Sequence, residues 1–215
     1  MDAFSAAGTL RDLLVGRLDP LTRDSAAVAA HSDLDLGPPP VADHLQDEPA
    51  PAAVLICLRE RAEGASVVLT RRAEGLRQHT GQVALPGGRC EPGESAPQAA
   101  VREAEEEVGL PRSAVELIGL STPYRTITAY HVTPVVGFAS PDIVLRANPG
   151  EVAAIFEAPF AVLMDLDRWE TREGRSPAGD LRRYYAMEWG GQLIWGATAG
   201  MLRALSERLH GGSEP

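Results

Sequence analysis

The sequence predicts an α/β fold in which a mixed β-sheet lies between helices. Apolar runs of strand length recur along the chain, a glycine-rich loop at residues 86–93 leads directly into a helix with an acidic face, and an amphipathic segment closes the chain. A chain that orders its elements as strands, a helix, more strands and a final helix typically packs those helices against the sheet. We therefore expect the core to form between sheet and helices.

The composition is that of a globular protein with an acidic surface. The chain has 215 residues and a formal net charge of -10, which argues against broad binding to nucleic-acid backbones. No apolar run approaches the roughly 20 residues that cross a bilayer, and the first residues lack the basic start and apolar core of a signal peptide. We therefore expect a cytoplasmic protein that binds neither nucleic acid nor membranes.

Two residue types narrow the chemistry. All 20 basic residues are arginine, so a lysine Schiff base or a lysine general base is excluded. Cys57 lies in an apolar run and Cys90 in the glycine loop, and their spacing indicates neither a zinc site nor a disulfide framework. Free thiols of this kind are typical of a reducing compartment.

The chain divides into three parts by composition. Residues 1–50 are expected to be an N-terminal extension, helical at residues 4–15 and 21–30 and irregular through the proline-rich stretch that follows. Residues 51–210 carry the strands and motifs of one domain, and residues 211–215 form a frayed tail. The sequence leaves open whether the extension packs on its own core or on another subunit, so a homodimer is an open alternative.

The strands follow from apolar runs bounded by turn residues. The first two, at residues 52–58 and 66–72, are expected to pair as a hairpin. A loop at residues 122–128 is expected to lie beside the site. The remaining expected elements are strands at 82–85, 115–121, 130–139, 151–157, 182–189 and 192–195, a short helix at 161–166, and a closing helix at 198–209.

The acidic helix has clear end signals. Ser95 followed three residues later by Gln98 reads as a capping box, and Pro97 is tolerated in the first turn. Gly109 ends the helix as a C′ residue, and Pro111 prevents it from resuming. The spacing therefore predicts a helix over residues 96–108.

One face of that helix gathers carboxylates. Glu103, Glu106 and Glu107 share an arc at spacings i, i+3 and i+4, whereas the apolar side chains share another arc that should pack on the sheet. With Glu94 from the preceding loop, these hard oxygen donors suit Mg²⁺ or Mn²⁺. The alternative is a solvated acidic face, which is the more common meaning of such a run on its own.

The loop and helix together resemble the Nudix box. Gly88, five residues, Glu94, seven residues and then Arg-Glu-Ala-Glu-Glu-Glu-Val-Gly-Leu at 102–110 match that pattern over its full length. The resemblance implies an α/β/α sandwich over about residues 50–210 and metal-dependent hydrolysis of a nucleoside diphosphate linked to another group. It implies metal ligands at Glu103, Glu106 and Glu107, extra contacts from the Gly87 carbonyl and Glu94, and structural roles for Arg102, Gly88 and Gly109.

The proton acceptor is less defined. A glutamate held unprotonated can accept a proton from the attacking water. Nudix proteins often recruit such a glutamate from outside the box, and Glu151, at the start of a predicted strand, is the candidate. The alternative for Glu151 is a solvated charge at a strand end. The catalytic candidates are therefore Glu106, Glu107 and Glu151.

The stretch before the box resembles the coenzyme A branch of Nudix hydrolases. Leu-Thr-Arg-Arg-Ala at 69–73, Arg77, Gly81 and Leu-Pro-Gly-Gly at 85–88 carry this likeness, with Leu85 where phenylalanine is usual. Thr-Ala-Tyr at 128–130 departs from the expected Ser-Gly-aromatic. The resemblance implies hydrolysis of coenzyme A to 3′-phosphoadenosine 5′-phosphate and 4′-phosphopantetheine.

Cations near the box are candidates for the substrate's phosphates. Arginine forks suit phosphate oxygens, although each arginine alone is as often part of a surface salt bridge. Tyr124 and Tyr130 could stack on adenine, although tyrosines are more often simply packed. The substrate-binding candidates are Arg71, Arg72, Arg77, His79, Arg125 and Tyr124.

Two other functions compete with a coenzyme A diphosphatase. One is a Nudix hydrolase of another nucleoside diphosphate derivative, such as ADP-ribose, or of a nucleoside triphosphate. The other is a Nudix-fold module that senses a nucleotide without cleaving it, and such a module should have lost box glutamates. Because Glu94, Glu103, Glu106 and Glu107 are all present, the sequence favours an enzyme.

Overall fold

The computed structural model describes residues 9–23, 29–33, 35–37, 48–73, 81–175 and 181–211. Its helices are α1 (Leu10–Val15), α2 (Ala96–Val108), α3 (Phe160–Leu163) and α4 (Ala197–His210). Its strands are β1 (His31–Ser32), β2 (Ala50–Arg61), β3 (Gly64–Arg72), β4 (Val83–Ala84), β5 (Gly87–Arg89), β6 (Val115–Leu120), β7 (Tyr124–Arg125), β8 (Tyr130–Ala139), β9 (Val152–Pro159), β10 (Glu170–Arg175), β11 (Leu181–Trp189) and β12 (Gln192–Trp195).

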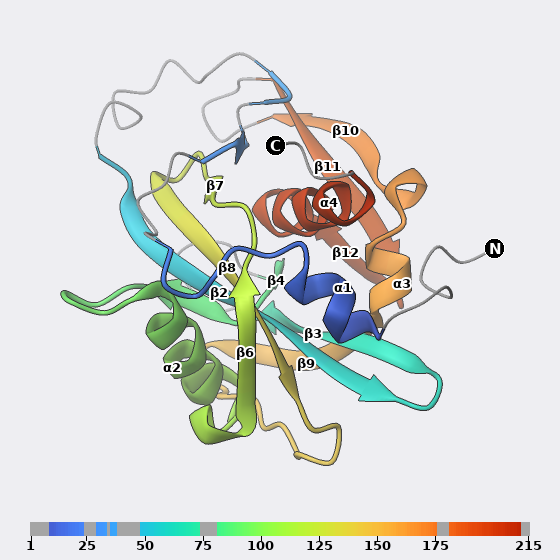
Figure 1. Ribbon diagram of the computed structural model, residues 1–215. Coiled ribbons are helices and arrows are strands. Elements are labelled where there is room, and N and C mark those ends of the chain that lie inside the picture. The colour runs from blue at the N-terminus through green and yellow to red at the C-terminus, as the bar shows by residue number, and fades with distance from the viewer. Residues whose placement is uncertain are drawn as a thin grey trace.

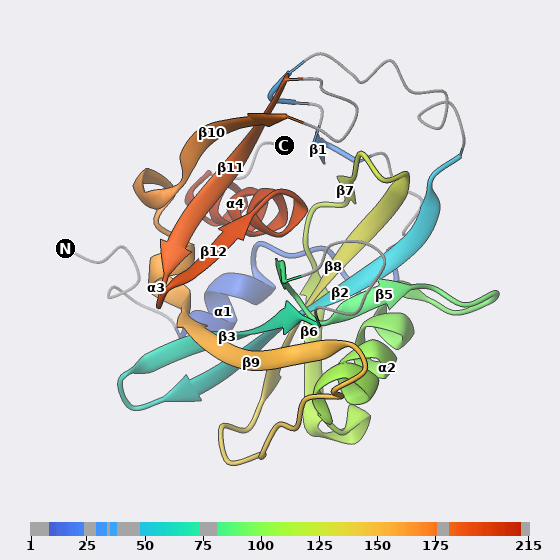
Figure 2. The same ribbon diagram turned by 180° about the vertical axis from the view of Figure 1, so that it is seen from behind.

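Nine of the described strands form one mixed sheet (Figures 1 and 2). Its main path is β1-β7-β8-β2-β3-β4, with β5 on β2, β6 on β8 and β9 on β3. β2 runs parallel to β8 and β1 parallel to β7, whereas the other pairs are antiparallel. The remaining described strands, β10, β11 and β12, form a small antiparallel sheet.

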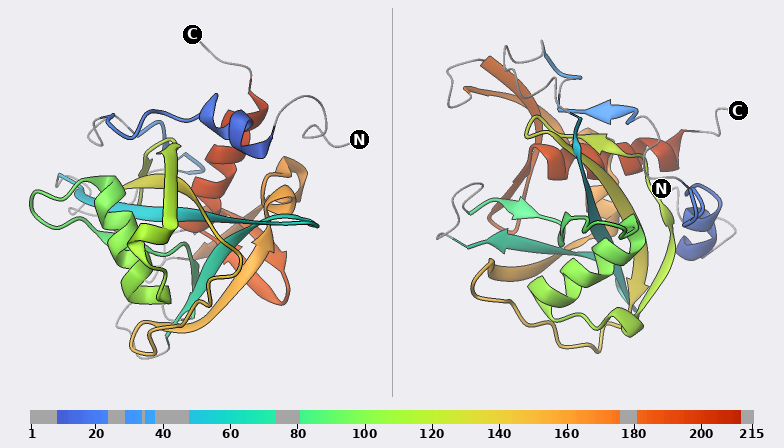
Figure 3. Two further views of the ribbon diagram at one scale, coloured as in Figure 1. Left: turned by 60° about the horizontal axis from the view of Figure 1, so that its bottom comes forward. Right: turned by 90° about the vertical axis from the view of Figure 1, so that its left-hand side faces the viewer.

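The two faces of the main sheet bury different helices. Alternate residues of a strand point to opposite faces, so Leu55 of β2 packs with the alanines of α2, while its neighbour Ile56 packs with Leu202 and Leu205 of α4. Figure 3 shows both helices against the strands. This α/β arrangement of a mixed sheet between helices confirms the predicted fold class. None of the described helices has the length and apolar character needed to span a membrane.

The described part of the N-terminal segment packs on the same core. Leu14 of α1 is fully buried, Asp19 forms a bridge with Leu120 of β6, and Arg208 of α4 donates to the Asp19 carboxylate. β1 adds a parallel strand beside β7. The sequence left open whether this segment packs on its own core. Within residues 9–23 and 29–33, these contacts show that it does.

Most predicted elements form, with differences at polar segments. The predicted hairpin, box helix, later strands and closing helix are confirmed within a few residues. β5 and β7 are short strands inside segments expected to be loops, and β10 was not predicted because Glu-Thr-Arg-Glu-Gly-Arg has no apolar alternation. Parts of the expected helices at 4–15 and 21–30, the tail beyond residue 211, and Arg77 and His79 lie outside the described residues.

Candidate active site on the acidic helix

Helix α2 has the ends that its sequence predicts. The Gln98 side chain accepts a hydrogen bond from the Ser95 backbone N–H at 2.9 Å, which completes the capping box. Gly109 adopts φ 66°, the left-handed conformation that favours glycine at C′. These two ends fix the rotation of the helix, and with it the direction in which each glutamate points.

The glycine loop lies against both β2 and the helix. β5 pairs antiparallel with β2, so that Gly87 lies opposite Val54 and Gly88 opposite Ala53. A Cβ atom on Gly88 would lie 2.5 Å from the Glu103 carboxylate, and one on Gly87 would lie 2.6 Å from the Val54 Cα. Gly87 therefore requires glycine, because a side chain there would displace the backbone of β2, whereas a side chain at position 88 would displace the Glu103 carboxylate.

Glu107 is a buried carboxylate whose negative charge is offset by few neighbouring groups. Only 4% of its surface is exposed. Its Oε2 accepts a hydrogen bond from the Gly87 N–H at 3.2 Å, and its Oε1 lies 3.8 Å from Nη1 of Arg72. Burial raises the pKa of Glu107 to about 7, and the charges of Glu103 and Glu151 act in the same direction. The sequence placed Glu107 with the other glutamates, but its depth of burial was not foreseen.

Arg102 joins the other box carboxylates. Its Nε and Nη2 each lie 2.9 Å from one oxygen of Glu94, and its Nη1 lies 2.9 Å from Glu103 and 3.3 Å from Glu106. Its Nη2 also donates to the Arg89 carbonyl. Hydrogen bonding by Arg102 lowers the pKa of Glu94. The guanidinium therefore holds the glycine loop to the helix.

Glu151 reaches the same cluster from a distant part of the chain. It directly precedes β9, where its carbonyl accepts from the Ala73 N–H and its N–H donates to the Asn148 carbonyl. The negative charge of Glu151 raises the pKa of both Glu103 and Glu107, after the larger effect of burial. Asn148 in turn donates its N–H to the Glu107 carbonyl at 2.9 Å, which ties this loop to α2.

The donor set suits a divalent cation. Burial, with the charges of neighbouring carboxylates, raises the pKa of Glu103 and Glu107, and the buried Glu107 has one backbone N–H and a distant guanidinium as its partners. Carboxylate oxygens of this kind are the ligands of Mg²⁺ and Mn²⁺. Within the described residues, no three acidic, histidine or cysteine groups stand ready to hold one ion. Arg102 bonds to Oε1 of Glu103 and to Oε2 of Glu106, so each of these carboxylates keeps a second oxygen that Arg102 does not contact.

The three candidate arginines that the structure describes do not form one cluster. Arg71 and Arg72 end β3, and Arg72 faces Glu107. Arg125 is in β7, which is separated from β3 by β8 and β2 in the order of the sheet. Neighbours in the sheet are about 5 Å apart, so Arg125 lies at a different part of the site from Arg72.

The expectation that Tyr124 stacks on a base is wrong. The residue is 4% exposed, and its hydroxyl donates to Oδ1 of Asp33 at 2.8 Å. A Cβ atom on Gly200 of α4 would overlap the Tyr124 ring, so this ring is packed against the helix. Sequence reasoning missed Asp33, because the two residues are 91 positions apart.

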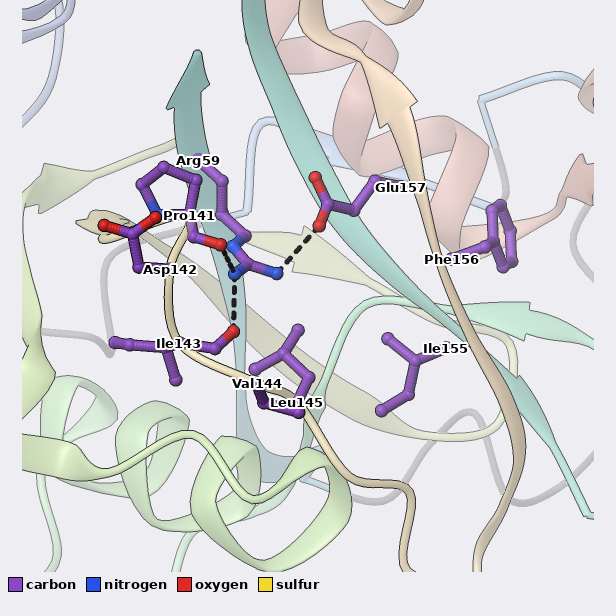
Figure 4. Close-up of a pocket in the computed structure, with 9 residues that line it drawn as sticks. All are labelled: Arg59, Pro141, Asp142, Ile143, Val144, Leu145, Ile155, Phe156 and Glu157. Atoms are coloured by element: carbon purple, nitrogen blue, oxygen red, sulfur yellow. Dashed lines mark hydrogen bonds and ion pairs between the residues drawn. The ribbon is translucent and has the colours of Figure 1, made fainter.

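A pocket of about 450 Å³ lies away from the acidic cluster (Figure 4). It is lined by Arg59, Glu157, Phe156, Ile155 and the loop at 141–145. Arg59 crosses its wall, with Nη1 2.8 Å from Glu157 and Nη2 bonded to the carbonyls of this loop. None of the candidate site residues lines this pocket, so its polar groups serve the fold.

Comparison with known proteins agrees with the box. A NUDIX domain model matches residues 49–183. The uncharacterized Nudix hydrolase NudL of Escherichia coli K12 is 44% identical over 159 residues, which cover 74% of this chain and 82% of that protein.

Solved structures are similar over part of the chain. The Nudix hydrolase RenU of M. smegmatis has a TM-score of 0.46 and 27% identity, covering 54% of this chain and 74% of that chain. A C. elegans Ap4A hydrolase complex has a TM-score of 0.45 and 19% identity, covering 51% and 80%. These likenesses are partial, so family membership depends on the domain match and on NudL. On those two matches, the chain belongs to the Nudix hydrolase family, enzymes that act on diphosphate bonds.

Proposed function

We propose that this enzyme hydrolyses the diphosphate of coenzyme A and releases 3′-phosphoadenosine 5′-phosphate and 4′-phosphopantetheine. The main support is the way in which the coenzyme A signature folds around the acidic cluster. Its segments at 69–73 and 85–88 lie on β3 and β5, and Arg72 from the first segment comes within 3.8 Å of Glu107, which accepts from Gly87 of the second.

The box carboxylates are the proposed metal site. Glu103, Glu106 and Glu107 would hold Mg²⁺ or Mn²⁺, with the Gly87 carbonyl as a further ligand. A bound divalent ion lowers the pKa of a coordinated water and neutralises charge that develops on phosphorus. Both carboxylate oxygens of Glu94 accept hydrogen bonds from Arg102. We therefore assign Glu94 to orienting the loop and not to binding the metal directly.

Glu151 is the proposed proton acceptor, with Glu106 and Glu107 contributing from the helix. In the reaction, the oxygen of water forms a bond to one phosphorus, the bond from that phosphorus to the bridging oxygen breaks, and a carboxylate takes the water's proton. The products are two phosphate monoesters. Glu151 suits this role because it approaches the cluster from the turn before β9 and pairs with Arg102 in no described contact.

The arginines are the proposed contacts for the substrate's anionic groups. Arg71 and Arg72 stand at the end of β3, where Arg72 lies 3.8 Å from Glu107, and both are proposed for the diphosphate. Arg125, with Arg77 and His79, is proposed for the 3′-phosphate, which needs cations apart from the metal site. An acidic protein needs such cations, because its net charge of -10 repels an anionic substrate.

Product identification tests the substrate. We expect mass spectrometry to detect both monoesters after incubation with coenzyme A and Mg²⁺ or Mn²⁺, and kcat/KM for coenzyme A to exceed that for ADP-ribose and for a nucleoside triphosphate. Preference for ADP-ribose or the triphosphate would replace coenzyme A with the competing substrate and leave the hydrolase assignment intact.

The proposed proton acceptor directly precedes β9, and a matched control lies within that strand. Glu151→Gln should lower kcat by roughly 10²–10⁴-fold, the usual contribution of general base catalysis. Glu157→Gln removes the same charge at the far end of β9 and should leave kcat of the folded protein unchanged. Equal activity of Glu151→Gln and the parent enzyme would remove Glu151 from the reaction.

A further inference from the structure

Residues 31–33 form part of the sheet beside the loop at 124–130. β1 pairs parallel with β7, with His31 opposite Tyr124 and Ser32 opposite Arg125. The Asp33 N–H then donates to the Arg125 carbonyl at 3.0 Å. The N-terminal segment therefore continues the sheet past β7 and ends with a carboxylate over the adjoining loop.

The Asp33 carboxylate holds two parts of that loop together. Its Oδ1 accepts from the Tyr124 hydroxyl at 2.8 Å, and its Oδ2 accepts from the Ile127 backbone N–H at 3.0 Å. Tyr124 is packed against α4, so one end of this connection is fixed in the core. The other end fixes the backbone of the turn at 126–129, where Thr128 is exposed.

The loop is held in a strained conformation. Ala129 has φ 60°, and no other non-glycine residue in the described part of the chain has a positive φ. That conformation costs an alanine roughly 1–2 kcal/mol. The turn is closed by Thr126, whose backbone N–H donates to the Tyr130 carbonyl and whose hydroxyl accepts from the Tyr130 N–H. Strain of this kind persists only where surrounding contacts impose it.

The loop and the glycine loop are anchored on the same end of β2. The Ala50 N–H donates to the Ala129 carbonyl, Tyr130 lies opposite Ala50, and Ala52 lies between Val132 of β8 and Arg89 of β5. Two strand spacings, about 10 Å, therefore separate β8 from the glycine loop at this end. Tyr130 is 37% exposed there, so its ring is available to a ligand.

From this geometry we infer that Asp33 is a positioning residue for substrate: it fixes the loop at 124–130 so that the Tyr130 ring meets the planar base of the nucleoside. The inference rests on the proposed action on a nucleoside diphosphate derivative. It gives the N-terminal segment a part in substrate recognition. A purely structural role for Asp33 is the competing explanation, and it predicts lower stability without a change in substrate affinity.

Asp33→Asn tests the inference with little change of shape. The amide can still accept from Tyr124, but its NH₂ group then faces the Ile127 N–H, so the second hydrogen bond is lost. We expect KM for coenzyme A to rise about tenfold, equivalent to about 1.4 kcal/mol, with kcat within about twofold of the parent. Hydrogen exchange at residues 126–130 should accelerate, while exchange in α2 stays unchanged.

Asp35→Asn is the matched control. Asp35 lies in the same segment and accepts from the Ser32 N–H and hydroxyl, both at 2.8 Å. Its charge acts on Tyr124, as that of Asp33 does, but no described hydrogen bond joins Asp35 to the loop. The variant removes the same charge and should leave KM, kcat and loop exchange unchanged. If both variants raise KM equally, loss of charge explains the effect and the positioning role is rejected.

A double-mutant cycle tests whether Asp33 acts through Tyr130. Tyr130→Ala should raise KM by a similar factor, and Asp33→Asn in that background should add less than about twofold. A full tenfold rise in the Tyr130→Ala background overturns the inference, as does a fall in melting temperature with KM unchanged. If coenzyme A is not the substrate, the same cycle on the preferred nucleoside diphosphate derivative still tests Asp33, and loop exchange needs no substrate.

Discussion

Glu107 and Glu157 are glutamates of similar chemistry in opposite electrostatic surroundings. Burial raises the pKa of Glu107 to about 7, since the Gly87 N–H and a guanidinium 3.8 Å away compensate it weakly. Burial also acts to raise the pKa of Glu157, but hydrogen bonds from Arg61 and Ser66 and the charge of Arg59 outweigh it, and the net pKa is lowered. β9 connects the two environments, because Glu151 directly precedes it and Glu157 lies near its end.

The difference separates a carboxylate that we propose as a metal ligand from one that stabilises the fold. Glu157 is matched by cations of the chain itself and needs no ligand to be stable. Glu107 lies among other carboxylates and is unfavourable as an anion until a positive charge arrives. Strongly perturbed titrating groups concentrate at functional sites for this reason. Around the box, the carboxylates therefore outnumber the cations that could neutralise them.

Removing a box carboxylate should produce the largest change. Glu103→Gln and Glu107→Gln should each lower kcat by roughly 10³-fold, about 4 kcal/mol of transition-state stabilisation, because each loses a proposed metal ligand. Steady-state kinetics with Mg²⁺ measures this. Glu105→Gln is the control: Glu105 is exposed on the same helix and pairs with Arg112. Loss of activity in the control alone, or in none of the three, would contradict the assignment.

Breaking the compensated pair should reduce stability and leave catalysis intact. Glu157→Gln leaves the Arg59 guanidinium buried without its carboxylate, and we expect unfolding in urea to cost about 3 kcal/mol less. Because the folded pKa of Glu157 is lowered, its contribution is present above the unfolded pKa and is lost as pH falls through the folded value. The variant should therefore lose less stability on acidification than the parent does.

Metal binding should stabilise the folded protein through the box carboxylates and not through Glu157. At 100 times its dissociation constant, Mg²⁺ or Mn²⁺ should add about 2.7 kcal/mol, a rise in melting temperature of roughly 5–10 °C, and EDTA should remove it. Glu107→Gln should lose most of this shift and Glu157→Gln should keep it. An identical shift in all three proteins would mean that the ion binds elsewhere.

The smallest expected effect concerns the outer partner of Glu157. The Arg61 side chain is 33% exposed, whereas that of Arg59 is 6% exposed. Arg61→Gln should therefore reduce the free energy of unfolding by about 1 kcal/mol or less, and Arg59→Gln by about 3 kcal/mol. Equal losses would show that burial does not separate the two arginines, which would weaken the contrast between the two ends of β9.

The parts of the site that are contiguous in sequence were predictable. Capping by Ser95 and Gln98, the end at Gly109 and the face shared by Glu103 and Glu107 follow from helical spacing within one segment. The strand at 52–58 was equally clear, because its residues are apolar throughout, as is typical of a buried strand.

The parts that join distant segments were not predictable. Pairing of β1 with β7 and the Asp33–Tyr124 hydrogen bond depend on residues about 90 positions apart, and neither segment is distinctive on its own. Arg71, Arg72 and Arg125 are indistinguishable as candidate phosphate ligands in the sequence. The order of the sheet, however, separates Arg125 from the other two. Tyr124 is an aromatic residue in a loop expected beside the site, which is typical of a ligand-binding residue. Only the packing of α4 shows that its ring is internal.

The burial of Leu14 bears on where this protein can be shortened. The matching domain model begins at residue 49 and ends at residue 183, whereas Leu14 of α1 and Leu202 and Leu205 of α4 are fully buried in one cluster with strands of the main sheet. An expression fragment trimmed to those limits would lack α1 and α4. The apolar core residues against which these helices pack would then be exposed to solvent. We expect such a fragment to be recovered in inclusion bodies.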